Sequence, residues 1–196
     1  MIRTGRLAAL VGGMAAVLTA GIAFGELKLG DQAPKWSRLS GTDDAKHGLS
    51  DYAGAKVLVV VFTCNKCPVA QAYQDRLIAL EKDFQSKGVQ VVAIDVNKGE
   101  GLKQMKERAK EKGYNFPYLN DPTQKSARDH GATTTPHVFV FNKDRKLVYL
   151  GGIDDSMNES KVKHHYLRDA LDAILVGKVP AKQETAHPGC TIKWKK

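Results

Sequence analysis

The sequence predicts one α/β domain built on a mixed central sheet with helices on both sides. Three observations lead to this fold class. Strand-like and helix-like segments alternate at the start of the domain, which favours a right-handed β-α-β unit with parallel strands. A β-hairpin follows, which adds antiparallel strands, and an amphipathic helix closes the domain. The chain has 196 residues, 42% of them hydrophobic, which is enough for a single globular core.

The first strand and the first helix are the clearest elements. Residues 57–62 are a continuous apolar and β-branched run, which is typical of a strand buried on both faces. From Pro68 onward, apolar residues recur at steps of three and four, so we expect one helix that runs to about Ser86 and stops before Gly88. The residues with this spacing are Val69, Tyr73, Leu77, Leu80 and Phe84.

The next segments continue the alternation. Residues 89–96 are predicted to form the second strand. Residues 102–112 are rich in lysine and form an amphipathic pattern that ends before Gly113, so they predict a second helix. A short apolar segment at 116–119 and a short helix over 124–130 come next.

The last part of the domain is predicted to be a hairpin and a helix. Residues 137–141 and 146–150 read as two strands joined by the turn 142–145. The segment Ser156–Glu159 resembles a capping box, so we expect it to open the closing helix. The apolar side of that helix uses Leu167, Ala170, Leu171 and Ile174.

These elements divide the chain into three parts. Residues 1–25 precede the domain, residues 26–179 form it, and residues 180–196 are a C-terminal tail that has no clear period and contains Cys190. The net charge is +9, but the lysines are scattered over predicted helix faces and loops. Because no nucleic-acid-binding motif accompanies them, we expect a solvated basic surface and no nucleic-acid partner.

Residues 1–25 have the pattern of an export signal. Arg3 and Arg6 precede the stretch 7–23, which is almost wholly apolar or small, and small residues follow at the position of a cleavage site. The stretch is at the short end for a membrane-spanning helix, so an uncleaved N-terminal anchor is the alternative. The sequence therefore predicts a periplasmic or secreted protein, or one held at the membrane by this segment.

Two of the three cysteines, Cys64 and Cys67, lie two residues apart at the predicted strand-to-helix turn. A helix start offers unpaired N–H groups and the positive end of the helix dipole, and Lys66 adds a positive charge. Both effects predict a lowered pKa for Cys64, which would make it the attacking thiolate. Cys67, one turn further along, would then release the mixed disulfide.

The segment Phe62–Pro68, with the sequence FTCNKCP, and Thr135-Pro136 ahead of a later strand together resemble the thioredoxin superfamily. Residues 30–34, with the sequence GDQAP, and an insertion near 97–123 are similar to its redoxin branch. That branch contains the alkyl hydroperoxide reductase/thiol-specific antioxidant-like proteins and thiol-disulfide oxidoreductases. The resemblance covers about residues 28–176.

This resemblance implies a thioredoxin-like fold with an N-terminal extension and an insertion before the cis-proline loop. It also implies that Pro136 is cis and packs against the disulfide, while the backbone of Thr135 pairs with a substrate chain. The activity it implies is that of an exported thiol-disulfide oxidoreductase acting on protein or small-thiol partners. No metal or organic cofactor is required, and a partner dithiol, such as a membrane-bound reductase, would supply the electrons.

The sequence departs from the thioredoxin pattern in ways that leave the direction of electron flow open. Thr63 replaces the usual tryptophan, and Lys66 replaces the usual proline before the second cysteine. No carboxylate lies within 57–61, where thioredoxins bury an acid. Asp75 or Asp95 would have to take its place, and we expect Asp75 to face solvent.

Two other functions stay open. A thiol peroxidase is the first, but peroxiredoxins use a Pro-x-x-x-Thr-x-x-Cys arrangement, whereas here Thr63 directly precedes Cys64 and position 59 is a valine. The second is a Cu(I) chaperone that would bind the metal with Cys64, Cys67 and either His130 or His137. Such chaperones have a CxxxCP spacing, one residue longer than the spacing found here.

Cys190 has three interpretations. The default is a free thiol or a link between two chains, and a further hypothesis is that it reaches back to the active pair. A zinc site that adds Cys190 and His187 to the pair is disfavoured, because a closed site would bury the nucleophile.

Overall fold

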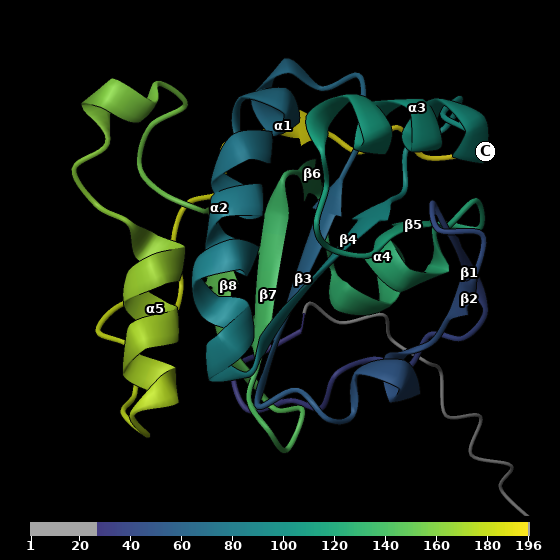
Figure 1. Cartoon of the computed structure of the whole chain (residues 1–196). Coiled ribbons are helices and arrows are strands. Elements are labelled where there is room, and N and C mark those ends of the chain that lie inside the picture. The colour runs from purple at the N-terminus through teal and green to yellow at the C-terminus, as the bar shows by residue number, and fades with distance from the viewer. Residues whose placement is uncertain (1–26, 196) are drawn as a thin grey trace, which may run out of the picture.

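The computed structural model describes residues 27–195, so the predicted export segment 1–25 lies outside the described residues. Seven strands form the main sheet in the order β2-β1-β5-β4-β3-β7-β8 (Figure 1). β3 is parallel to β4 and antiparallel to β7, so the sheet is mixed as predicted. The strands are β1 (Leu39–Gly41), β2 (Lys46–His47), β3 (Val57–Thr63), β4 (Val89–Asp95), β5 (Tyr118–Asn120), β7 (His137–Phe141) and β8 (Leu147–Gly151).

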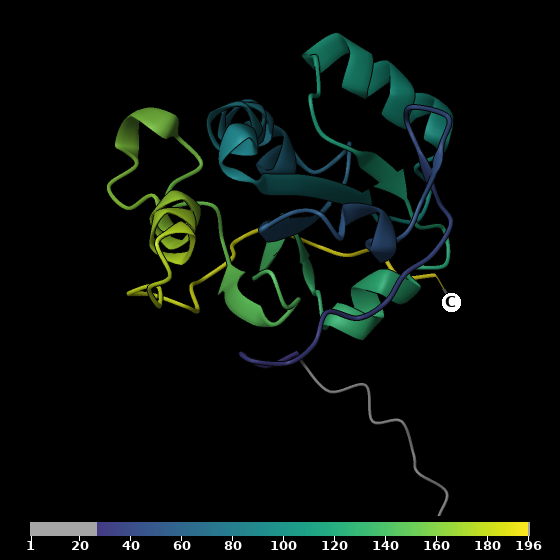
Figure 2. The same ribbon diagram turned by 60° about the horizontal axis from the view of Figure 1, so that its bottom comes forward.

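Helices cover both faces of the sheet. Side chains of α2, α3 and α5 pack on one face, whereas α4 and the N-terminal part of the described residues pack on the other (Figure 2). Among the helices of residues 27–195, none has both the length and the apolar character needed to cross a membrane. The helices are α1 (Pro68–Ala72), α2 (Gln74–Phe84), α3 (Leu102–Lys112), α4 (Lys125–His130) and α5 (Tyr166–Leu175), with 3-10 turns η1 (Leu49–Tyr52), η2 (Gln85–Lys87) and η3 (Glu159–Lys161).

The central strand β3 explains how the two cores form. Its residues alternate between the faces of the sheet: Val59 and Val61 join the core under α2 and α5, and Val60 and Phe62 join the core on the α4 side. The prediction of a strand buried on both faces is therefore confirmed. Because β3 ends at Thr63, it delivers the cysteine segment to the edge where β4 and β5 also end.

Two predicted helices differ from those in the structure. The helix expected from Pro68 to about Ser86 is divided at Tyr73, whose N–H bonds to the carbonyl of Ala70 at 3.2 Å and closes the short α1. The prediction that Ser156–Glu159 opens the closing helix is wrong. Asn158 caps the separate turn η3, and α5 begins only at Tyr166.

The C-terminal tail is tied to distant parts of the chain, which explains why its sequence has no period of its own. It first runs beside β8, where the N–H of Leu150 donates to Gln183 and the N–H of Thr185 donates to Leu150. It then forms strand β9 (Cys190–Thr191), which pairs antiparallel with β6 (Thr134–Thr135) in a small second sheet. Figure 1 shows β9 beside β6 and the start of α1.

Candidate functional site

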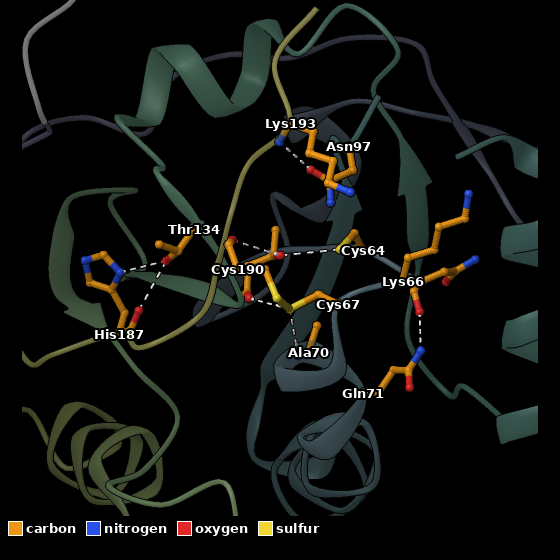
Figure 3. The surroundings of a disulfide bond; sticks show 12 residues. Cys64, Lys66, Cys67, Ala70, Gln71, Asn97, Thr134, His187, Cys190 and Lys193 are labelled. Carbon is orange, nitrogen blue, oxygen red and sulfur yellow. Dashed lines mark hydrogen bonds between the residues drawn. A yellow bond between two sulfur atoms is a disulfide. The ribbon is translucent and has the colours of Figure 1, made fainter. Parts of the chain in front are cut away.

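Cys67 and Cys190 are joined by a disulfide bond, although 123 positions separate them in the sequence. Figure 3 shows this bond with Cys64 beside it as a free, buried thiol. The default expectation for Cys190, a free thiol or an interchain link, is therefore wrong, and the hypothesis that it reaches back to the pair is confirmed. The disulfide expected within the CxxC segment is not the one that the structure contains.

The N-terminus of α1 forms a hydrogen bond with the sulfur of Cys67 and not with that of Cys64. Cys67 is the N-cap of α1, and its sulfur accepts a hydrogen bond from the N–H of Ala70 at 3.4 Å. The same sulfur lies 3.2 Å from the carbonyl oxygen of Thr135. A disulfide sulfur has no hydrogen to donate, so this contact can become a hydrogen bond only when Cys67 is reduced. The helix N-terminus therefore favours a thiolate at Cys67.

Cys64 lies in a different environment from the one predicted. The residue is only 1% exposed, and its sulfur lies 3.4 Å from the hydroxyl oxygen of Thr135. Burial raises the pKa of Cys64, and the negative charges of Glu100 and Asp95 raise it further. The Thr135 hydroxyl and the N–H of Cys67 lower the pKa of Cys64, but by less than burial and the two carboxylates raise it. The predicted low pKa of Cys64 is therefore wrong for this disulfide state.

The cysteine loop is held by Glu100 rather than by the charge of Lys66. The carboxylate of Glu100 accepts hydrogen bonds from the N–H groups of Asn65 at 2.5 Å and Lys66 at 3.2 Å. The exposed ammonium group of Lys66 donates to the carbonyl of Gly99 at 3.3 Å. A carboxylate therefore occupies the anion position at these N–H groups, and an effect of Lys66 on Cys64 stays a prediction.

Asp95 supplies the buried acid that the sequence left unassigned. It is fully buried at the end of β4, opposite Thr63, and accepts hydrogen bonds from the N–H of Asn97 and the hydroxyl of Tyr118. Burial, together with the neighbouring Glu100, raises the pKa of Asp95 to about 8. Asp95 can therefore hold a proton near neutral pH and release it to, or take it from, nearby groups. Asp75 is exposed, as predicted.

Thr135 and Pro136 connect the three cysteines. The Thr135–Pro136 peptide bond is cis, which confirms what the resemblance implies. Thr135 contacts both cysteines of the CxxC segment and pairs in register with Cys190. The protein's own tail thus occupies the backbone position that the resemblance assigns to a substrate chain.

The two histidines considered for a metal site have other neighbours. His130 is buried among aromatic rings, with its ring centre 5.0 Å from that of Phe62, and its Nδ1 bonds to the carbonyl of Ser126. His137 stacks on His187 with ring centres 3.7 Å apart. Within residues 27–195, no group of three or more His, Cys, Asp or Glu side chains is arranged to hold a metal ion.

Sequence reasoning missed Glu100 and gave the bond of Cys190 only as a hypothesis. Glu100 lies 35 positions from the loop that it holds, and no motif marks it. The bond of Cys190 had one weak signal, since it is the only cysteine outside the CxxC segment. Cys64, Cys67, Thr135 and Pro136 were all predicted, and the structure brings them together.

Comparison with known proteins finds a family and solved structures to which the chain is similar. The model of the AhpC/TSA family matches residues 29–150. A hypothetical protein from Sinorhizobium meliloti 1021 is 32% identical, with a TM-score of 0.81 over 87% of this chain and 97% of its own. An uncharacterized conserved protein from Geobacillus kaustophilus is 36% identical, with a TM-score of 0.79 over 86% of this chain and 93% of its own. The curated proteins include no match to the sequence.

One solved structure of lower sequence identity is named for a function. It is a putative thiol:disulfide interchange protein DsbE from Chlorobium tepidum, with 22% identity and a TM-score of 0.58 over 64% of this chain and 85% of its own. This likeness shows a shared fold. The predicted thioredoxin-like fold is therefore confirmed, and so is the resemblance to the redoxin branch.

Proposed function

Because the chain belongs to the AhpC/TSA family, we propose that it is a thiol-disulfide oxidoreductase that exchanges disulfides with a protein or small-thiol partner. The observation that carries the proposal is the Cys67–Cys190 disulfide, which lies against the third thiol, Cys64, and beside the cis-proline loop. Disulfides persist mainly in oxidising compartments outside the cytosol. The Cys67–Cys190 bond therefore supports a location in the periplasm or outside the cell, with residues 1–25 as signal or anchor.

In the reductive direction, a partner thiolate attacks the sulfur of Cys190, which is half-buried and the most accessible of the three. A partner–Cys190 disulfide forms, the Cys67–Cys190 bond breaks, and Cys67 leaves as a thiolate that the N–H of Ala70 stabilises. A second partner thiol then displaces Cys190. Two electrons pass from the partner to the Cys67/Cys190 pair, and the reverse sequence oxidises a partner dithiol.

The test is a redox titration of the purified protein against glutathione, with mass mapping of the disulfide at each potential. We expect a two-electron couple at Cys67 and Cys190. A potential near about −270 mV would mark a reductant and one near about −120 mV an oxidant. The Cys67→Ser variant should lose the couple and the exchange with a partner disulfide. A bond that stays intact below about −300 mV would identify an inert structural disulfide and overturn the proposal.

A thiol peroxidase is the second candidate, and one observation favours it. When reduced, Cys67 would meet the N–H of Ala70 at the helix start, which stabilises the thiolate that attacks a peroxide. Cys64 has no such support because its burial raises its pKa. Peroxide consumption by the reduced protein well above the rate of a free thiol, and its loss in Cys67→Ser, would place peroxidase first. The Cu(I) chaperone lacks a comparable observation, since His130 and His137 pack elsewhere.

A further inference from the structure

We propose that Cys64 opens the Cys67–Cys190 disulfide from within the protein. In this step the disulfide moves into the CxxC segment, and Cys190 is released together with the tail strand. The inference rests on the proposed function, because it gives the redox site two disulfide positions. It assigns a role to Cys64, the one cysteine that the exchange at Cys190 does not use.

The first support is the position of the Cys64 sulfur. Cys64 and Cys67 lie in one small buried cluster, and Cys190 packs against it. The backbone N–H of Cys67 lowers the pKa of Cys64, which agrees with a Cys64 sulfur that lies near the residue it would attack. Thr135 fixes the arrangement, since its hydroxyl oxygen is 3.4 Å from the sulfur of Cys64 and its carbonyl oxygen is 3.2 Å from that of Cys67.

The second support is the environment of the leaving group. Cys190 is half-buried on the tail, so water can solvate its thiolate as the bond to Cys67 breaks. Both Cys64 and Cys67 are buried, and neither has this access to solvent. A bond between Cys64 and Cys67 therefore keeps the disulfide inside and leaves the free thiol at the better-solvated position.

The step is balanced without an external reagent. Cys64 loses its proton, and its thiolate forms a bond to the sulfur of Cys67. The Cys67–Cys190 bond breaks, its electron pair goes to the sulfur of Cys190, and that sulfur takes up a proton. The protein has one disulfide and one thiol before and after the step, so nothing is oxidised or reduced overall.

The consequence concerns the tail. Its strand β9 is held to β6 by backbone pairing and to the start of α1 by the disulfide, and the N–H of Ile192 donates to the carbonyl of Thr133. Loss of the covalent bond leaves the tail held by non-covalent contacts alone. These are the two-residue pairing of β9, which is weak for so short a strand, the buried side chain of Ile192, and the hydrogen bonds of Lys193 with Lys98 and Asn97. Release of the tail then uncovers the edge of β6 and the new Cys64–Cys67 disulfide for a partner that cannot reach them under β9.

An alkylation trap tests the step on the complete oxidised protein, with no added thiol. Native protein is treated with iodoacetamide at about pH 8, where thiolates form, and is mapped by mass spectrometry. We expect Cys190 to carry the label and Cys64 to be bonded to Cys67, with Cys190 labelled roughly tenfold or more over Cys64. The labelling rate should not change on dilution, because the exchange is internal. Hydrogen exchange in residues 187–195 should be faster after labelling.

Three results would overturn the inference. These are a label on Cys64 with the Cys67–Cys190 bond intact, a label on Cys67 with a Cys64–Cys190 bond, and no label at all. The matched control is Cys64→Ser, which has no free thiol when oxidised and should take no label. If Cys190 were labelled in this control, the label in the native protein would come from reduced molecules and not from attack by Cys64. That result would also overturn the inference. No partner takes part, so the trap can fail while the redox titration still supports an oxidoreductase.

Discussion

Gly189 lies so close to Thr135 that a β-carbon at Gly189 would be 2.5 Å from the carbonyl oxygen of Thr135. The same β-carbon would be 2.9 Å from the carbonyl carbon, so the obstacle is backbone and cannot move aside. Gly189→Ala should therefore push the tail away from β6, at a cost of about 1–3 kcal/mol, as for other overpacked sites. We expect the Cys67–Cys190 bond to become easier to reduce, by roughly tenfold in the exchange equilibrium with glutathione.

Gly54→Ala is the matched control for this substitution. A β-carbon at Gly54 would meet no atom within 4 Å, and the residue is exposed. The two variants share the loss of a glycine but only Gly189→Ala creates a clash at the tail. If both shifted the glutathione equilibrium equally, the close approach of Gly189 to Thr135 would not be the cause.

The parts of the site that could be predicted from the sequence depend on neighbours in the chain. The apolar run 57–62 and the period that begins at Pro68 place the cysteines at a strand-to-helix turn, which the structure contains. Thr135-Pro136 precedes a strand for equally local reasons, and its cis bond follows from the resemblance. Local pattern decides such elements because a strand or helix start is specified within a few residues.

The other parts of the site depend on contacts between distant segments, which no local sequence pattern reveals. β9 contains two residues and owes its existence to β6, more than fifty positions away. Glu100 holds the cysteine loop from the segment before α3 and adds a negative charge beside Cys64. The sequence indicated a helix dipole and Lys66 near Cys64 but could not indicate burial, and burial is the largest influence on this thiol.

Substitutions of Glu100 and Lys66 should affect the alkylation rate of Cys64 differently. In a Cys67→Ser/Cys190→Ser background, Cys64 is the only thiol of the chain. Glu100→Gln removes a negative charge that raises the pKa of Cys64, so we expect severalfold faster alkylation at pH 7. Lys66→Gln should change the rate by less than about twofold, because its ammonium is exposed and directed at Gly99. Alkylation slower by more than about twofold in Lys66→Gln than in the background would restore the role predicted from the sequence.

Asp95 should make the stability of the folded protein depend on pH. Its pKa is about 8 in the folded protein and about 3.9 in an unfolded chain. Between these values the folded protein binds more protons than the unfolded chain, so the free energy of unfolding decreases as the pH rises from about 4 to about 8. The decrease is at most about 1.4 kcal/mol per pH unit.

The Asp95→Asn variant removes the titrating group but keeps a side chain of the same shape. We expect its free energy of unfolding, measured by urea denaturation at several pH values, to decrease less steeply across this window than that of the native protein. Asp75→Asn, at an exposed position on α2, should keep the native slope. Equal slopes in the native protein and Asp95→Asn would show that Asp95 ionises normally in the folded state.

Thr135 and Thr134 are adjacent in β6 but should have separable effects. Thr135→Val removes the hydroxyl that lowers the pKa of Cys64, while the backbone pairing with Cys190 is kept. We therefore expect a severalfold slower alkylation of Cys64 near neutral pH, measured in the single-thiol background as a rate profile against pH. Thr134→Val instead removes the 2.9 Å hydrogen bond with the ring of His187, so it should speed hydrogen exchange in the tail of the disulfide-bonded protein. If Thr135→Val shifted tail exchange as much as Thr134→Val did and left the Cys64 profile unchanged, the hydroxyl of Thr135 would have only a structural role.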